Sequence, residues 1–191
     1  MTKETHTKQK ARPTERRKSF GRGFSLVESL VAIVILITAI TGVSSAIRTA
    51  ISSYTLSRDQ IIAFYLAQEG FEFIRNMRDQ NALNTPALPW LTGIASNIND
   101  PCWFGNACIV DPINSNVPTR CSAIGSCPVL RQDTTNLFFG HNGAWAATKF
   151  RREIILTQVD AKEISVLVTV SWTHGSSNQE FRARENILNW P

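Results

Sequence analysis

Glu28 is the residue whose chemistry is hardest to explain in this sequence. It is the only charged residue from Phe24 to Ile47, a run of 24 residues that is otherwise uncharged and mostly apolar. A carboxylate costs about 2.5–3.5 kcal/mol at the centre of a membrane span and less near its end. If the chain is cut between Gly23 and Phe24, a new α-amino group appears, with a pKa of about 7.7, so it is largely protonated at neutral pH. Between staggered neighbouring helices this amine and Glu28 can pair, which predicts a role for Glu28 in assembly.

The stretch from Gly23 to Glu28, followed by the apolar run, resembles the N-terminus of type IV prepilins and of the related pseudopilins of type II secretion. The resemblance implies that prepilin peptidase cuts after Gly23 and that the new N-terminal Phe24 is N-methylated. It also implies that Glu28 acts in assembly with other pilin subunits and the pilus machinery. A weaker resemblance, to minor pilins of the PilV and GspI type, extends through the next helix and the C-terminal strands.

The four cysteines form two C-x5-C units, Cys102 with Cys108 and Cys121 with Cys127, twelve residues apart. Structural zinc sites use tighter spacing, usually two to four residues between cysteines. Export past the membrane favours disulfides instead. We expect two disulfides and no metal or cofactor, with pairing inside each unit preferred, although three connectivities are open.

The charge of the chain is concentrated at its N-terminus. Residues 1–23 carry eight Lys or Arg and two Glu, a net charge of +6, and the remainder carries −1. The basic pI therefore reports a leader that is removed, and a nucleic-acid partner is not supported. Positive flanks stay in the cytoplasm, so the apolar helix 24–47 is expected to cross the inner membrane once with its N-terminus inside. A plain signal anchor, or a signal peptide cut after Ala46, is the alternative.

The elements that follow predict an α+β fold. Residues 48–80 contain no proline and have apolar residues at helical spacing, which indicates an amphipathic continuation of the first helix. Its apolar stripe comprises Ile47, Ile51, Tyr54, Ile61, Ile62, Tyr65, Leu66, Phe73 and Met77, and its other faces carry Arg48, Arg58, Asp59, Gln68, Glu72, Arg75 and Arg78. Residues 81–130 hold six of the eight prolines and read as a loop-rich segment stapled by the cysteines.

The last segment, 131–191, is predicted as an antiparallel sheet that packs on the long helix. A hairpin is expected around Asn142-Gly143, and the strand from Glu163 to Trp172 alternates cleanly, with one face buried. Lys149, Arg151 and Arg152 are expected to form the solvated start of a strand.

The sequence contains no recognised catalytic motif: no G-x-S-x-G, no H-E-x-x-H and no P-loop. We therefore expect a substrate of processing enzymes rather than an enzyme. The predicted function is a minor pilin-like subunit of a type IV pilus, inserted in the membrane and then built into an extracellular filament through its N-terminal helix. A type II secretion pseudopilin is one alternative, and a secreted or anchored binding protein cut at Ala46 is the other.

Overall fold

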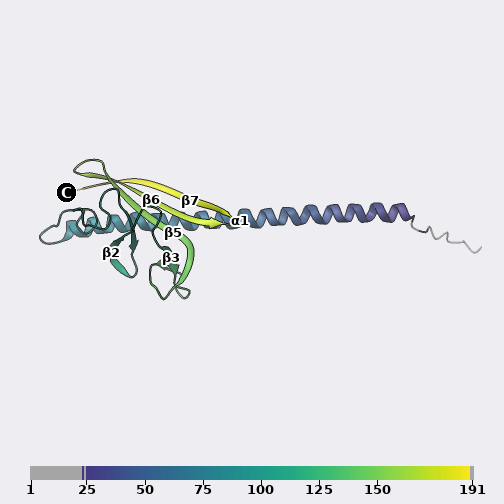
Figure 1. The fold of residues 1–191 in the computed structure, drawn as a ribbon, viewed down its shortest axis with the longest axis horizontal. Helices are drawn as coiled ribbons and strands as arrows, with labels where there is room; N and C mark the ends of the chain where they lie inside the picture. The colour runs from purple at the N-terminus through teal and green to yellow at the C-terminus, as the bar shows by residue number, and fades with distance from the viewer. Residues whose placement is uncertain (1–22, 24, 190–191) are drawn as a thin grey trace, which may run out of the picture. The chain divides into compact units, whose positions relative to one another are not determined.

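The computed structural model describes residues 23 and 25–189, and it confirms an α+β fold. One helix, α1 (Leu26–Leu83), precedes a seven-stranded antiparallel sheet (Figure 1). Contacts divide the chain into residues 1–49 and residues 50–191, and the two units are described separately below.

The sheet is built around one long strand, β5 (Ala146–Gln158). On one edge, β5 pairs with β1 (Ala107–Asp111) and with β3 (Val129–Gln132), and on the other with β6 (Glu163–His174). Three further strands complete the sheet: β2 (Ser115–Arg120) beside β1, β4 (Phe139–Gly140) beside β3, and β7 (Ser177–Leu188) beside β6.

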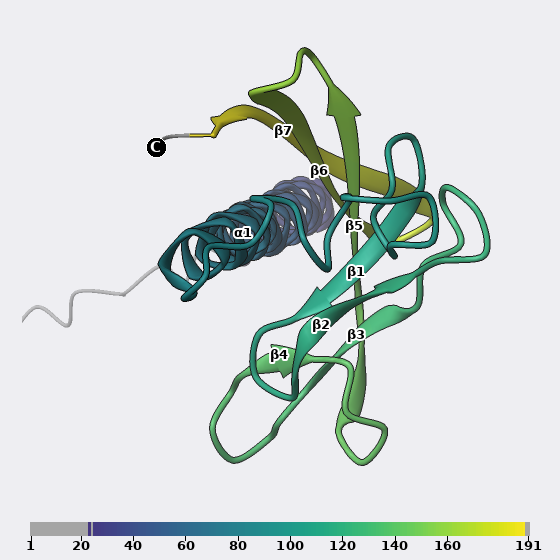
Figure 2. The same cartoon turned by 90° about the vertical axis from the view of Figure 1, so that its left-hand side faces the viewer.

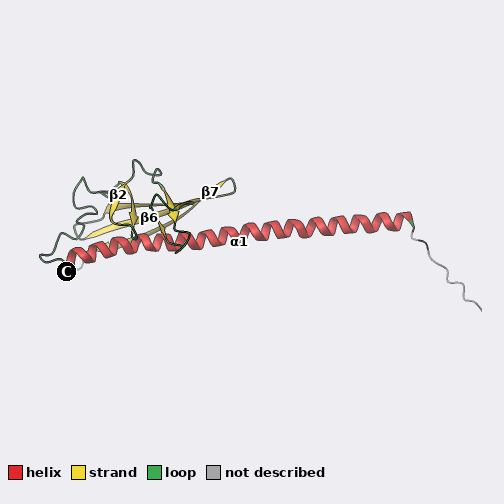
Figure 3. Cartoon of the chain, turned by 90° about the horizontal axis from the view of Figure 1, so that it is seen from below, coloured by secondary structure: helices red, strands yellow, loops and turns green. Residues whose placement is uncertain are grey.

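Residues 50–83 of α1 lie along one face of this sheet, and the sheet curves around them (Figure 2). All the strands lie on one side of the helix (Figure 3). The buried positions of the helix include Ala63, Ala67 and Gly70, whose small side chains let the sheet approach closely. At Gly70 an added Cβ would lie 3.3 Å from Ile154 Cδ1 and 3.4 Å from Val168 Cγ1, so a larger residue fits only if these side chains shift.

The predicted apolar stripe of the helix is only partly buried. Leu66 and Phe73 face the core as expected, whereas Ile51, Tyr54, Ile61 and Tyr65 are exposed. The face that packs on the sheet is instead centred on small residues, because close approach of a helix to a sheet requires them. Asp59, which was expected on a solvated face, is buried there, and its carboxylate accepts a hydrogen bond of 2.5 Å from Lys149 Nζ.

The core lies between this helix face and the inner face of β5 and β6. The predicted alternation in β6 is confirmed: the five residues on its inner face are buried, namely Ile164, Val166, Val168, Val170 and Trp172. On β5, Phe150, Ile154 and Leu156 point the same way, since side chains on one face recur at every second residue.

Arg152 lies in this core, and the expectation that it is solvated was wrong. Its side chain is fully buried. It donates to Leu66 O at 3.0 Å and to Val110 O at 2.9 Å, and it forms an ion pair with Glu69. The side chain thus connects α1, β1 and β5.

The sheet also begins earlier than expected. Strands β1 and β2 fall within 81–130, the segment predicted to be loop-rich. β1 is stabilised there because it pairs antiparallel with β5, with Ala107 opposite Ile155 and Cys108 opposite Ile154.

The hairpin predicted around Asn142-Gly143 is wrong in its pairing. A turn is present, with Trp145 N donating to Asn142 O at 3.1 Å. The flanking strands β4 and β5 do not pair with each other, because β3 lies between them and pairs with both.

Candidate functional site: the apolar helix and the disulfide-bonded loops

The predicted processing site lies just before the first helix. Gly23 is exposed and outside α1, and an added Cβ there would meet no atom within 4 Å. Phe24, the predicted N-methylation site, lies outside the described residues. Cleavage after Gly23 and methylation of Phe24 therefore stay predictions.

Glu28 lies in the first turn of α1 and is exposed. The first turn of a helix suits a carboxylate, because the free backbone N–H groups there carry partial positive charge. Among the described residues, no hydrogen bond or ion pair to the Glu28 side chain is formed within the chain.

The helix that follows Glu28 exposes large apolar side chains on every face. Those that are at least half exposed between Leu26 and Ile51 are Leu26, Val27, Leu30, Ile33, Val34, Ile35, Leu36, Ile37, Ile40, Val43, Ile47 and Ile51. Contiguous apolar surface of this extent marks a site that lipid or protein covers. The helix is long and apolar enough to cross a membrane, although a signal sequence near an N-terminus would pass the same test.

Three hydroxyl groups in this segment donate to backbone carbonyls of the same helix. Thr38 Oγ1 donates to Val34 O at 3.0 Å, Thr41 Oγ1 to Ile37 O at 2.9 Å, and Ser45 Oγ to Gly42 O at 2.9 Å. Backbone and hydroxyl groups without such partners would be costly in hydrocarbon. Glu28 is the only charged side chain that the described segment 25–47 presents.

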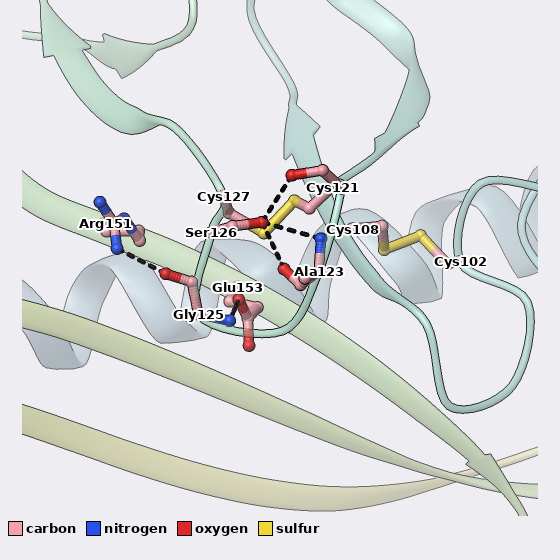
Figure 4. The surroundings of a disulfide bond; sticks show 10 residues. Cys102, Cys108, Cys121, Ala123, Gly125, Ser126, Cys127, Arg151 and Glu153 are labelled. Carbon is pink, nitrogen blue, oxygen red and sulfur yellow. Dashed lines mark hydrogen bonds between the residues drawn. A yellow bond between two sulfur atoms is a disulfide. The ribbon is translucent and has the colours of Figure 1, made fainter.

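All four cysteines are paired in disulfides, with the connectivity preferred from the sequence. One bond joins Cys102 to Cys108, and the other joins Cys121 to Cys127 (Figure 4). The first bond ties the loop before β1 into the main core. The second closes the loop after β2 and packs beside Ile155 in a smaller apolar cluster.

The Cys121–Cys127 loop is further held by two charged residues of β5. Arg151 Nη1 donates to Gly125 O at 2.7 Å, and Gly125 N donates to Glu153 Oε2 at 2.7 Å (Figure 4). Gly125 has a φ of 79°, a conformation that favours glycine. The loop is therefore a fixed surface feature that exposes the side chain of Ile124.

A polar cluster joins the middle of α1 to the end of β6. His174 Nε2 lies 3.2 Å from Ser52 Oγ, and His174 Nδ1 lies 3.8 Å from Asp59 Oδ2. The sequence of contacts from Ser52 through His174 to Asp59 resembles that of a nucleophile, a base and an acid that orients the base. Lys149, however, already binds the same Asp59 oxygen at 2.5 Å, so the carboxylate is held as part of a structural ion pair.

A second histidine, His141, is half-buried next to Asp111. Burial lowers the pKa of His141 below its usual 6.5, and the nearby positive charge of Arg152 lowers it further. Burial would raise the pKa of Asp111, but hydrogen bonds from the backbone of His141 and from Asn114 outweigh it and leave the pKa below 3.8. Because folding lowers both pKa values, both groups make the folded state more stable at neutral pH than in acid.

Sequence reasoning missed two ion pairs that each have one buried partner: Arg152 with the partly exposed Glu69, and Asp59 with the partly exposed Lys149. The signal for Arg152 was present, since it shares the alternation of Phe150, Ile154 and Leu156 along one strand. Among the described residues, no group of three or more His, Cys, Asp or Glu is arranged to hold a metal ion.

In comparisons with known proteins, no family model, no curated protein and no solved structure matches the chain.

Proposed function

We propose that the chain is a pilin-like structural subunit, a minor subunit of a type IV pilus. It is inserted once in the inner membrane with its N-terminus inside, is cut after Gly23 by prepilin peptidase, and is N-methylated at Phe24. It then enters an extracellular filament through its N-terminal helix. The resemblance of Gly23 to Glu28 to the prepilin motif supports this proposal.

The observation that carries the proposal is the isolated Glu28 on an apolar helix. The helix exposes apolar groups on all sides, and Glu28 is the only charged residue from Phe24 to Ile47; within the described part of the chain its carboxylate has no hydrogen bond or ion pair. A plain membrane anchor or a signal peptide gains nothing from this carboxylate. A subunit whose neighbours present a protonated α-amino group does, because each charge then neutralises the other.

The two disulfides agree with export. The globular unit contains two S–S bonds and no free cysteine within its described residues. Such bonds form and persist in oxidising surroundings outside the cytoplasm.

The test compares wild type with Glu28→Gln, which removes the charge and keeps the shape. In cells with the assembly machinery, both precursors are expected to insert and to be cut to Phe24, because a neutral amide is cheaper than a charge in hydrocarbon. Only wild type is expected in sheared filaments. Mass spectrometry of the N-terminal peptide reports cleavage and methylation, and fractionation reports incorporation.

Thr49→Val is the matched control, since it removes a hydroxyl from the same helix without changing its charge. This variant should enter filaments like wild type. If Glu28→Gln does so as well, the pairing argument is wrong. A mature N-terminus at Ile47, or an uncut Met1, would instead favour the secreted or anchored protein.

A further inference from the structure

A groove beside α1 is the apolar surface of the globular unit that the proposed function leaves unexplained. It has a volume of about 340 Å³ and is lined mainly by apolar side chains. Ile62 and Tyr65 form its helical side, and Ile113, Leu137 and Phe138 form the opposite side, with Glu69 at the end nearer the C-terminus of the helix. Tyr65, Leu137 and Phe138 are each more than half exposed.

Leu137 reaches this groove at a conformational cost. Its φ is 62°, and it is the only non-glycine residue with positive φ in the described chain. This region disfavours residues that carry a Cβ, and a branched side chain in it is uncommon. A strained residue with an exposed apolar side chain gains nothing for folding, so the observation points to a function of the side chain.

The loop that carries Leu137 is held firmly in place. Leu137 N donates to Asp133 O at 2.8 Å, and Asp133 N donates to Phe138 O at 2.9 Å. The Asp133 carboxylate accepts two more bonds, from Thr135 N and Asn136 Nδ2, each at 2.8 Å. Leu137 and Phe138 are thus presented in a fixed conformation, which lowers the entropy lost when a partner binds.

We propose that this groove receives the apolar N-terminal helix of a second copy of the chain; the inference rests on the pilin-like function proposed above. Each copy carries a helix with the required chemistry, because residues 29–47 are uncharged and expose apolar groups all round. In a filament of parallel subunits, the apolar side chains of these helices are no longer in lipid and must be buried against neighbouring subunits.

Charge complementarity sets the register of the second helix. The first cation after its apolar run is Arg48. The exposed acid one turn beyond Glu69 is Glu72, which also forms a solvent-exposed ion pair with Arg75 of its own helix, at 3.4 Å. Placing Arg48 of one copy beside Glu72 of another shifts the two parallel helices by 24 residues, or about 36 Å at ~1.5 Å per residue. Residues 38–45 of the incoming helix then lie opposite 62–69. That segment includes Gly42, whose lack of a side chain permits close approach.

The first experiment changes the strained residue in the full chain. Leu137→Asn keeps a residue that tolerates positive φ and removes the apolar side chain. The thermal midpoint of the globular unit is expected to rise, while incorporation into sheared filaments falls about tenfold, as for the loss of one well-buried apolar contact. Ile124→Asn is the control, because Ile124 is equally exposed but lies on the disulfide loop away from the groove.

A photo-crosslink identifies the occupant. p-Benzoylphenylalanine in place of Phe138 should, on irradiation of sheared filaments, form an adduct with a peptide from residues 38–48 of another copy. Adducts with a different protein, with lipid, or with another part of the chain would overturn the proposal. A charge exchange tests the register: Arg48→Glu should reduce incorporation, and Arg48→Glu with Glu72→Arg should restore it.

The outcomes separate this inference from the proposed function. If wild type enters filaments but Leu137→Asn does so equally well, the groove does not bind a neighbouring helix and the pilin-like function stands. If wild type is neither cut at Phe24 nor found in filaments, the proposed function is wrong, and the groove inference fails with it.

Discussion

Replacing the buried Arg152 should destabilise the globular unit more than any surface change. The guanidinium donates to Leu66 O and Val110 O and forms an ion pair with Glu69, and no part of the side chain is exposed. Arg152→Met keeps most of the volume and the unbranched shape, but it removes all three interactions. The Val110 carbonyl then loses this donor and the Glu69 carboxylate loses its partner, whereas the Leu66 carbonyl lies inside α1 and keeps its helical hydrogen bond.

The magnitude follows from these contacts. A buried carbonyl that loses its donor costs about 1–3 kcal/mol, and breaking a buried ion pair costs about 3–5 kcal/mol. Glu69 is one-third exposed and can turn toward water, which reduces the second cost. Methionine also avoids the desolvation penalty of the guanidinium. Together these effects lower the free energy of unfolding by about 3 kcal/mol.

Urea unfolding of the full chain in detergent, followed by tryptophan fluorescence, measures this difference. Trp172 lies in the same core as Arg152 and reports its loss. Arg182→Met is the control on the same sheet, because Arg182 is largely exposed and pairs only with the exposed Glu180. Its effect should stay within about 0.5 kcal/mol. If Arg152→Met comes within about 1 kcal/mol of wild type, the three contacts do not stabilise the fold as argued.

Two further predictions concern acid and oxidation. Folding lowers the pKa of His141 below 6.5. The stability that neutral His141 contributes is therefore present above pH 6.5 and is lost as the pH falls through the folded-state pKa. Thermal midpoints should drop between pH 7.5 and 5.5, and His141→Gln should reduce that drop. Intact-mass analysis with alkylation should find four protected thiols before reduction. Cys121→Ser with Cys127→Ser should cost roughly 2 kcal/mol for so short a loop, and four alkylated thiols without reduction would contradict both bonds.

Much of the fold could be predicted because its signals are local. The alternation in β6 needs only the rule that side chains on one strand face recur at every second residue, and the helix needs only an apolar pattern without proline. The errors arose where tertiary contacts decided. Asp59 and Arg152 are buried because each meets an opposite charge from a distant segment. β4 pairs with β3 rather than β5 because β3 lies between them.

The same distinction applies to the functional surfaces. The motif from Gly23 to Glu28 is contiguous, so its chemistry can be interpreted from a single stretch of sequence. The groove is assembled from the helix at Ile62, the loop at Ile113 and the loop at Leu137, and no spacing rule connects these three places. Neither the positive φ of Leu137 nor its exposure is visible in the sequence. The proposed docking groove therefore has to be found from the fold, whereas the apolar segment that we propose it binds can be found from the sequence.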